Sequence, residues 1–300
     1  MPAVSVVAPL HNEEGNIEPL YRGIKDAMAA LGRSYEIIFV NDCSSDQTLK
    51  KIGDLQRNDA TLHCCDLAQN VGENWALLAG VSKAHGEIIV TIDGDFQNDP
   101  VFIPALVKKI ESGFRVVSGW RRKRVGSFST RILPSIVANK LISLLSGVPV
   151  HDCGCGLKAY RRNVLAGKFV PKGFMNRFSP VAFGVKAGEF TEIEITDQMR
   201  LYGNSHYGLS RVLIVLNDLM VVPFLDLPRE RTQSIALLLR NISGLGALGA
   251  AVESYVYGDP WAHLGIALGV LCLGSRSVYN NITSFINAQQ YPIFNIKAFK

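Results

Sequence analysis

The sequence predicts an α/β fold in which a mostly parallel sheet is covered by helices on both faces. Short β-branched runs alternate with amphipathic stretches from residue 4 onward, and this alternation is typical of parallel strands joined by crossover helices. The chain has 300 residues, of which 48% are hydrophobic and 19% charged, so it can bury a large core. Beyond residue 210 apolar and small residues dominate.

The expected strands and helices follow one another along the chain. The strands cover residues 4–10, 35–41, 61–68, 86–93 and 114–120, and the helices between them cover 16–31, 45–58, 71–84 and 102–113. A further helix is predicted over 127–146, followed by a helix near 178–188 and a strand over 190–197. The helix over 127–146 carries an apolar stripe of Ile132, Ile136, Leu141, Leu144 and Leu145.

Polar and acidic residues follow three of the expected strands. Asn41 and Asp42 end the second strand, Asp93 and Asp95 end the fourth, and a polar loop follows Pro9. Ligands of parallel α/β sheets bind at the carboxyl ends of the strands. We therefore expect these residues to face one crevice.

The segment DGDFQ, residues 93–97, predicts a metal site. Two carboxylates one residue apart can converge on a divalent cation, and hard oxygen ligands suit Mg²⁺ or Mn²⁺, ions that often bridge nucleotide phosphates. A plain polar turn is the alternative, because Asp and Gly are common in loops. The chain has no GxxxxGK[ST] motif and no GxGxxG after its first strand, which argues against P-loop hydrolysis and hydride transfer.

The charge and the cysteine content indicate which partners the protein can bind and in which cellular compartment it works. The net charge of +5 and the basic cluster at 121–124 are compatible with phosphate-bearing or membrane-surface partners, and we expect no nucleic-acid partner. The six cysteines form no CxxC pair and no signal peptide is visible. We therefore expect reduced thiols on the cytoplasmic side and no zinc site.

The chain divides into an α/β domain (1–210), an amphipathic juxtamembrane segment (211–232) and a C-terminal hydrophobic helical hairpin with a short tail (233–300). A membrane span needs about 20 apolar residues, and 234–256 and 259–275 are the candidates. The loop between them carries only acidic charges, whereas both outer flanks are basic. This pattern favours two transmembrane helices with both ends in the cytoplasm. A soluble hairpin packed on the α/β domain is the alternative.

Five sequence blocks resemble one enzyme family in their order and spacing. They are VSVVAPLHNEEGNI (4–17), FVNDCSSDQT (39–48), AQNVGENWALLAG (68–80), TIDGDFQNDP (91–100) and DCGCGLKAYRR (152–162). They resemble the family 2 inverting glycosyltransferases of GT-A fold, and within these the polyprenyl-phosphate glycosyltransferases, the group that includes dolichol-phosphate mannosyltransferase and bactoprenol glucosyltransferase. The resemblance covers about residues 1–215, and more loosely the hydrophobic tail.

On the donor side, the resemblance implies a nucleotide-sugar site with a metal. The residues that match the family's nucleotide-sugar contacts are Pro9, Asn12, Glu13, Asp42, Asp93, Gln97, Arg200 and Ser205. Within this set Asp42 matches the aspartate that holds the base. Asp93, Asp95 and Gln97 match the residues that hold the metal and the diphosphate.

On the acceptor side, the resemblance implies contacts to a lipid phosphate. Arg121, Arg131 and Ser135 lie where the family places these contacts, and Asp152 lies where an acidic residue adjoins the acceptor. Together with Asp95 from the metal site on the donor side, Asp152 and Arg131 are the predicted catalytic residues.

The implied reaction is a metal-dependent, inverting transfer of a sugar from a nucleoside diphosphate to undecaprenyl or dolichyl phosphate, with Mg²⁺ or Mn²⁺ as cofactor. A UDP-sugar is preferred over GDP-mannose as the donor, and the resemblance also implies membrane attachment and a homo-oligomer, with a tetramer possible. The chain departs from the usual pattern at Cys43 (Gly), Gln69 (Arg) and His206 (Lys). Two alternatives stay open, a soluble family 2 enzyme acting on a glycan or small acceptor and a nucleotide-sugar-binding protein without turnover.

Overall fold

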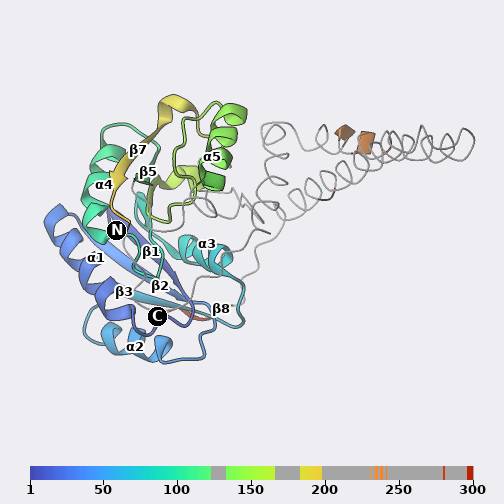
Figure 1. Cartoon of the computed structure of the whole chain (residues 1–300). Coiled ribbons are helices and arrows are strands. Elements are labelled where there is room, and N and C mark those ends of the chain that lie inside the picture. Colours follow the sequence, from blue (N-terminus) through green and yellow to red (C-terminus); the bar gives the residue numbers. More distant parts are fainter. Residues whose placement is uncertain are drawn as a thin grey trace, which may run out of the picture.

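The computed structural model describes residues 1–122, 133–165, 183–197 and 296–299, with the single positions 231, 234, 235, 237, 238, 241 and 280. These residues form one sheet in the order β7-β5-β6-β4-β1-β2-β3-β8 (Figure 1). The strands are β1 (Val4–Leu10), β2 (Tyr35–Asn41), β3 (Leu62–Leu67), β4 (Ile88–Thr91), β5 (Val116–Arg121), β6 (Lys158–Arg161), β7 (Phe190–Ile195) and β8 (Ile296–Phe299).

Most neighbouring strands in this sheet are parallel. Strand β1 pairs in parallel with both β2 and β4, and β2–β3 and β5–β7 are also parallel. Strand β6 runs antiparallel between β4 and β5, and β8 runs antiparallel to β3. The prediction of a mostly parallel α/β sheet is therefore confirmed.

Helices cover both faces of the sheet, as predicted. They are α1 (Ile17–Leu31), α2 (Thr48–Gln56), α3 (Glu73–Lys83), α4 (Ile103–Glu111), α5 (Leu133–Ser146) and the short α6 (Arg162–Leu165), with 3-10 turns η1 (Pro100–Phe102) and η5 (Ala187–Glu189). Side chains of α1, α2 and α4 belong to the same core as Val4, Val6 and Ala8 of β1. Those of α3 and α5 share the opposite core with Val7 (Figure 1). Alternate residues of β1 thus serve two separate cores, which is the pattern of a strand buried on both faces.

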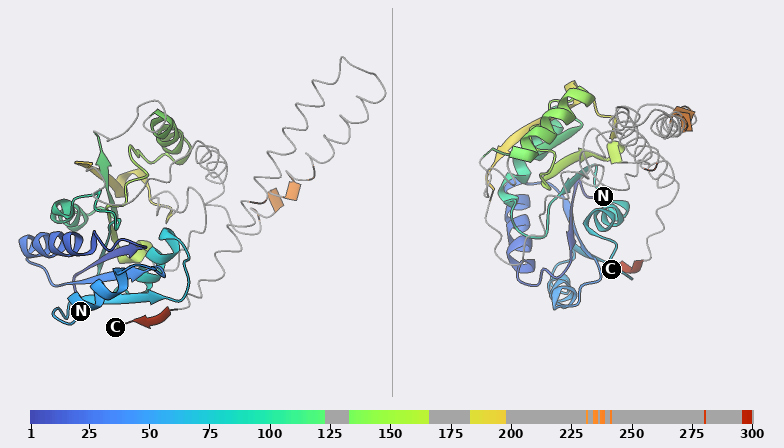
Figure 2. Two further views of the ribbon diagram at one scale, coloured as in Figure 1. Left: turned by 60° about the horizontal axis from the view of Figure 1, so that its bottom comes forward. Right: turned by 45° about the vertical axis from the view of Figure 1, so that its right-hand side comes forward.

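Strand β8 is an unexpected part of this sheet, because no strand was predicted in residues 233–300. It pairs with β3, and Figure 2 shows it in red beside the blue and cyan N-terminal elements. The ring of Phe299 stacks on His63 with centroids 5.7 Å apart, and Lys83 Nζ lies 5.6 Å from the Phe299 ring centre. A segment more than 200 residues away in the sequence therefore covers the outer edge of β3.

The apolar stripe predicted on α5 is only partly its buried side, since Leu141 packs against the core but other members do not. Ile136 and Leu144 are 51% and 78% exposed, whereas Asn139 and Ile142 are buried. The amide of Asn139 donates to the carbonyl of His151 at 2.6 Å. The inward side of α5 thus combines Ile142, which joins the core, with a polar residue that satisfies a loop carbonyl.

Two other predictions meet the structure only in part. The prediction of a helix near 178–188 was wrong over the described residues 183–188, where a turn leads into η5. The prediction of a strand over 190–197 was confirmed by β7. Among the helices that the structure describes, none combines the length and apolar character that crossing a bilayer requires. The predicted hairpin lies almost entirely outside the described residues, so the division at 210 and 232 stays a prediction.

The packing of α3 on the sheet gives a stability prediction. A Cβ on Gly80 would lie 2.5 Å from Val7 Cγ1 and 2.6 Å from Val40 Cγ2. We expect Gly80→Ala to destabilise the full-length protein by about 1–3 kcal/mol through overpacking, measured by denaturant unfolding. Gly53→Ala is the matched control in α2, where nothing lies within 4 Å, and it should stabilise by about 0.5–1 kcal/mol. Equal effects of the two substitutions would contradict the packing argument.

Candidate functional site

A cavity of about 360 Å³ opens at the carboxyl ends of the central strands. Its walls come from the loops after β1, β2 and β4, the start of α3, the end of β5 and the loop before β6. Pro9, Asp42, Asp93 and Asp95 all line it. The expectation of one crevice is therefore confirmed for these four residues, whereas Asn41 does not line the cavity and its amide donates to Asp66 Oδ1 at 2.7 Å.

The acidic wall of the cavity is the turn after β4. Asp93 Oδ2 accepts a hydrogen bond from Asn98 Nδ2 at 3.4 Å, and Asp95 Oδ1 accepts one from the Gln97 backbone N–H at 3.1 Å. Phe96 has a φ of 58°, which is unfavourable for a bulky residue. Asp95 is 7% exposed. The turn thus holds its two carboxylates in a fixed and locally strained backbone, as functional sites often do.

This acidic turn fits a hard divalent cation. Asp93, Asp95 and Gln97 all reach the cavity and offer only oxygen ligands from their side-chain carbonyl and carboxylate groups. Within the described part of the chain, no three His, Cys, Asp or Glu side chains form a group that could hold a metal. A cation here would therefore complete its coordination with substrate oxygens and water, the usual arrangement for Mg²⁺ at phosphate sites.

Asp42 holds the neighbouring wall together. It is 1% exposed, and its two carboxylate oxygens accept hydrogen bonds from the backbone N–H groups of Val71 at 2.7 Å and Gly72 at 2.8 Å. The next residue, Cys43, has a φ of 54°, in the region that favours glycine. Each carboxylate oxygen retains a second lone pair, so Asp42 can brace this loop and still accept a hydrogen bond from a ligand.

His11 lines the cavity next to Asp42, although the sequence indicated only a loop position for it. Its Nδ1 lies 2.7 Å from the Asp42 backbone carbonyl oxygen, and this contact requires a proton on Nδ1. Nε2 is then an acceptor, and Asn70 Nδ2 lies 3.2 Å from it. The ring is thereby fixed at the cavity wall. Its only sequence signal was its place between Pro9 and Asn12.

The basic wall is formed by Arg121, which pairs with Asp152. Arg121 Nε and Nη2 donate to the two Asp152 carboxylate oxygens at 2.7 and 3.1 Å, and the Arg121 backbone N–H adds a third contact at 3.3 Å. Arg121 Nη1 lies 3.9 Å from Asp197 Oδ1. Burial acts to lower the pKa of Arg121, but the adjacent Asp152 charge outweighs it and raises that pKa above its ordinary value. The Arg121 guanidinium is therefore charged at neutral pH.

The loop that precedes β6 supplies the remaining wall. Gly154, Cys155, Gly156 and Lys158 reach the cavity, although the sequence singled out only Asp152 in this block. Burial raises the pKa of the Cys155 thiol to about 12, so Cys155 is a neutral thiol rather than a metal-binding thiolate at neutral pH.

The other predicted site residues lie in different places. Glu13 lines the cavity, whereas Asn12 and Ser135 are described but do not line it. The side-chain oxygen Oδ1 of Asn12 instead accepts from the Ser45 backbone N–H at 2.8 Å. Asp152 lies behind Arg121 and is 1% exposed. The residues that fall outside the described part of the chain are Arg131, Arg200 and Ser205.

Proteins of similar sequence are transferases named for polyprenyl phosphates. The chain is 36% identical over 260 residues to dodecaprenyl-phosphate galacturonate synthase of Rhizobium johnstonii, covering 84% of this chain and 75% of that protein. It is 31% identical over 264 residues to undecaprenyl-phosphate 4-deoxy-4-formamido-L-arabinose transferase of Pseudomonas aeruginosa, covering 88% and 77%.

A solved structure shares the fold. Glucosyl-3-phosphoglycerate synthase of Mycobacterium tuberculosis, in complex with Mn²⁺, UDP and glucosyl-3-phosphoglycerate, matches with a TM-score of 0.55 and 19% identity, over 74% of this chain and 78% of that chain. The likeness at this identity shows a GT-A-like α/β fold. Residues 5–167, more than half of the chain, match Glycosyl transferase family 2, and the chain therefore belongs to this family of glycosyltransferases.

Proposed function

We propose that this enzyme transfers a sugar from a nucleoside diphosphate to polyprenyl phosphate, with inversion at the anomeric carbon. The observation that carries this proposal is one cavity lined both by an acidic, oxygen-rich turn and by Arg121, whose side chain is 12% exposed. The acidic turn suits a cation and a diphosphate, and the arginine suits a second anion. The two long matches to polyprenyl-phosphate transferases support this acceptor.

The donor would lie along the walls formed by Asp42 and the turn after β4. Asp42 and His11 would contact the base, and Asp93, Asp95 and Gln97 would hold a cation together with the diphosphate. A UDP-sugar is preferred over GDP-mannose, and the related fold that holds Mn²⁺ and UDP supports this choice. Arg200 and Ser205 would contact the diphosphate from the segment that follows β7.

The acceptor phosphate would approach Arg121, and we assign Arg131 and Ser135 to the same group of contacts. A phosphate monoester is already anionic near neutral pH, so one of its oxygens can attack the anomeric carbon without a strong base. Asp152 then orients Arg121 instead of removing a proton, because both of its oxygens are engaged by that arginine.

Catalysis would rest on stabilising the departing diphosphate. When bound, Mg²⁺ or Mn²⁺ supplies positive charge at the diphosphate. Asp93 and Asp95 would fix the position of that charge, and Arg121 would bring the second anion close without letting the two repel each other. The bond between the anomeric carbon and the donor phosphate breaks as the bond to the acceptor oxygen forms.

We further propose that residues 211–232 and the hydrophobic hairpin with its candidate spans 234–256 and 259–275 attach the enzyme to a membrane, with the catalytic domain on the cytoplasmic side and several copies assembled. This part of the proposal rests on the hydrophobic pattern and the placement of basic residues in the sequence.

Removal of a cation-binding carboxylate should abolish transfer. We expect Asp95→Ala to lower turnover at least about 100-fold and to leave thermal unfolding without metal near that of the parent, since the loss acts on charge stabilisation. The assay is transfer of radiolabelled sugar from a panel of nucleotide sugars to polyprenyl phosphate, followed by extraction into organic solvent across a Mn²⁺ titration. Asp26→Ala, an exposed aspartate on α1, is the matched control. Undiminished turnover of Asp95→Ala would refute the cation site.

The role of Asp152 can be separated from that of a general base. We expect Asp152→Asn to raise KM for the lipid phosphate and to lower kcat by less than about tenfold, without moving the pH profile, because the amide oxygen still accepts from Arg121. Loss of a general base would lower kcat by about 10²–10⁴-fold. Asp26→Asn serves as the control, and rates are referred to folded protein, since breaking a buried ion pair is destabilising. Loss of the acidic-side fall of kcat, the limb that a general base produces, would contradict the orienting role.

A further inference from the structure

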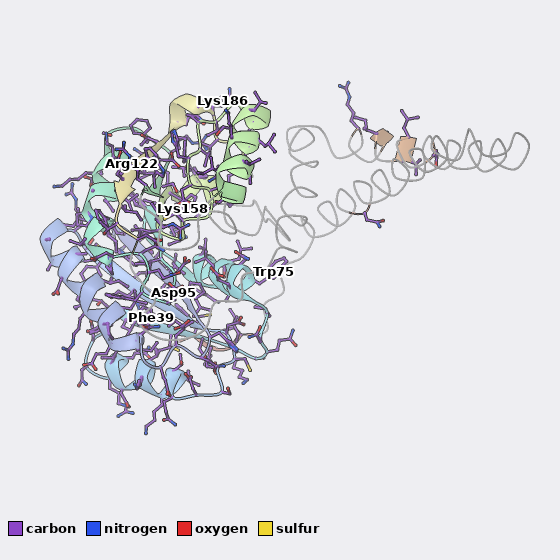
Figure 3. The ribbon with its side chains drawn as sticks, in the orientation of Figure 1. Phe39, Trp75, Asp95, Arg122, Lys158 and Lys186 are labelled. Carbon is purple, nitrogen blue, oxygen red and sulfur yellow. The ribbon has the colours of Figure 1, made fainter. Side chains whose placement is uncertain are left out.

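Lys158 is a buried cation in the wall of the cavity. It is 2% exposed, begins β6 opposite Thr91 of β4, and lies in the interior of the domain in Figure 3. An ammonium group removed from water is costly unless its N–H groups are satisfied. Its Nζ donates to the backbone carbonyl of Cys155 and, at 3.2 Å, to that of Cys153. The charged group is thus used to hold the backbone of the loop before β6.

This loop is held on its other sides as well. Thr91 Oγ1 donates to the carbonyl of Gly156 at 2.8 Å. The backbone N–H of Cys153 donates to Asn139 Oδ1 at 3.3 Å, and Cys155 Sγ lies 3.5 Å from Asn98 Oδ1. The loop is therefore tied to β4, to α5 and to the turn that carries the acidic residues.

The loop in turn lies directly against Asp93. A Cβ placed on Gly156 would be 1.9 Å from Asp93 Oδ1 and 2.1 Å from Oδ2. No side chain can fit at this position without moving the carboxylate or the loop. Asn98 contacts the same carboxylate at 3.4 Å. The orientation of the Asp93 carboxylate thus depends on where the loop backbone lies.

We propose that Lys158 is a positioning residue for Asp93. By holding the carbonyl groups of Cys153 and Cys155, Lys158 keeps Gly156 against the Asp93 carboxylate and so fixes the direction in which that carboxylate meets a divalent cation. The inference rests on the proposed function in one respect, which is that Asp93 binds such a cation. Groups that orient metal ligands in this way typically change metal affinity by about 10–100-fold when they are removed.

The test measures Mn²⁺ binding to the full-length protein in the presence of UDP, by titration calorimetry. We expect Lys158→Met, which keeps the length of the side chain but removes its charge and donors, to raise the Kd for Mn²⁺ by about 10–100-fold. Gly156→Ala should raise it as well, without any change of charge, because the added methyl group displaces Asp93. Lys158→Arg, which keeps the charge and donors, should restore part of the affinity. Lys50→Met, an exposed lysine on α2, is the matched control.

The outcomes separate three conclusions. The positioning role is overturned if Lys158→Met has a melting temperature without metal near that of the parent and a Kd for Mn²⁺ within about twofold of the parent's. The expected rise in that Kd is about 10–100-fold. If Lys158→Met does not fold, Gly156→Ala decides, since unchanged Mn²⁺ binding in that variant overturns the proposal too. If the parent itself shows no Mn²⁺ binding that depends on Asp95, the proposed function fails first.

Discussion

Close backbone packing around the turn after β4 is the constraint on which the site depends. Strand β4 lies between β1 and β6, so its final turn is confined by the loop after β1 and the loop before β6. A Cβ on Gly94 would lie 2.7 Å from the Pro9 carbonyl oxygen, and a Cβ on Gly156 would lie 1.9 Å from Asp93 Oδ1. Two glycines on different elements therefore let three chain segments meet where the acidic side chains emerge. The position of the carboxylates follows from the sheet order.

The charged groups at this edge of the sheet are oriented by the protein itself. Backbone N–H groups hold Asp42, Arg121 holds Asp152, and backbone carbonyls hold Lys158. Each of these contacts satisfies a buried ion that would otherwise be unstable away from water. Because these contacts fix the charged groups in advance, the groups need to reorient little when a charged substrate binds. Charges and dipoles that are fixed in this way stabilise a reaction best.

The fold and the location of the site could be predicted because both depend on local patterns. The alternation of strands and helices gave β1 to β5 and α1 to α4, and the rule for carboxyl ends of parallel strands brought Asp42, Asp93 and Asp95 together. Features that depend on distant contacts could not be predicted. The strand β8 pairs with a partner over 200 residues away, and the burial of the polar Asn139 on α5 depends on the carbonyl of His151 that its amide binds.

Two cavity residues were missed for a similar reason. His11 and Lys158 are of ordinary residue types for a loop and a strand start, and only the folded chain shows that they reach the cavity. The pairing of Arg121 with Asp152 was also invisible, since each residue alone suggested contact with the acceptor. Sequence motifs therefore indicated which segments form the site, but not which side chains bind one another.

The antiparallel strand β8 also bears on how the protein can be handled. Edge strands offer unpaired N–H and C=O groups to other chains, and proteins commonly cover such edges. Here residues 296–299 cover β3, with the ring of Phe299 lying over His63. Removing residues 296–299 from the chain, or fusing a bulky tag next to them, would expose the edge of β3 to self-association. A tag at the N-terminus, where Met1 is fully exposed, is therefore the safer choice for purification.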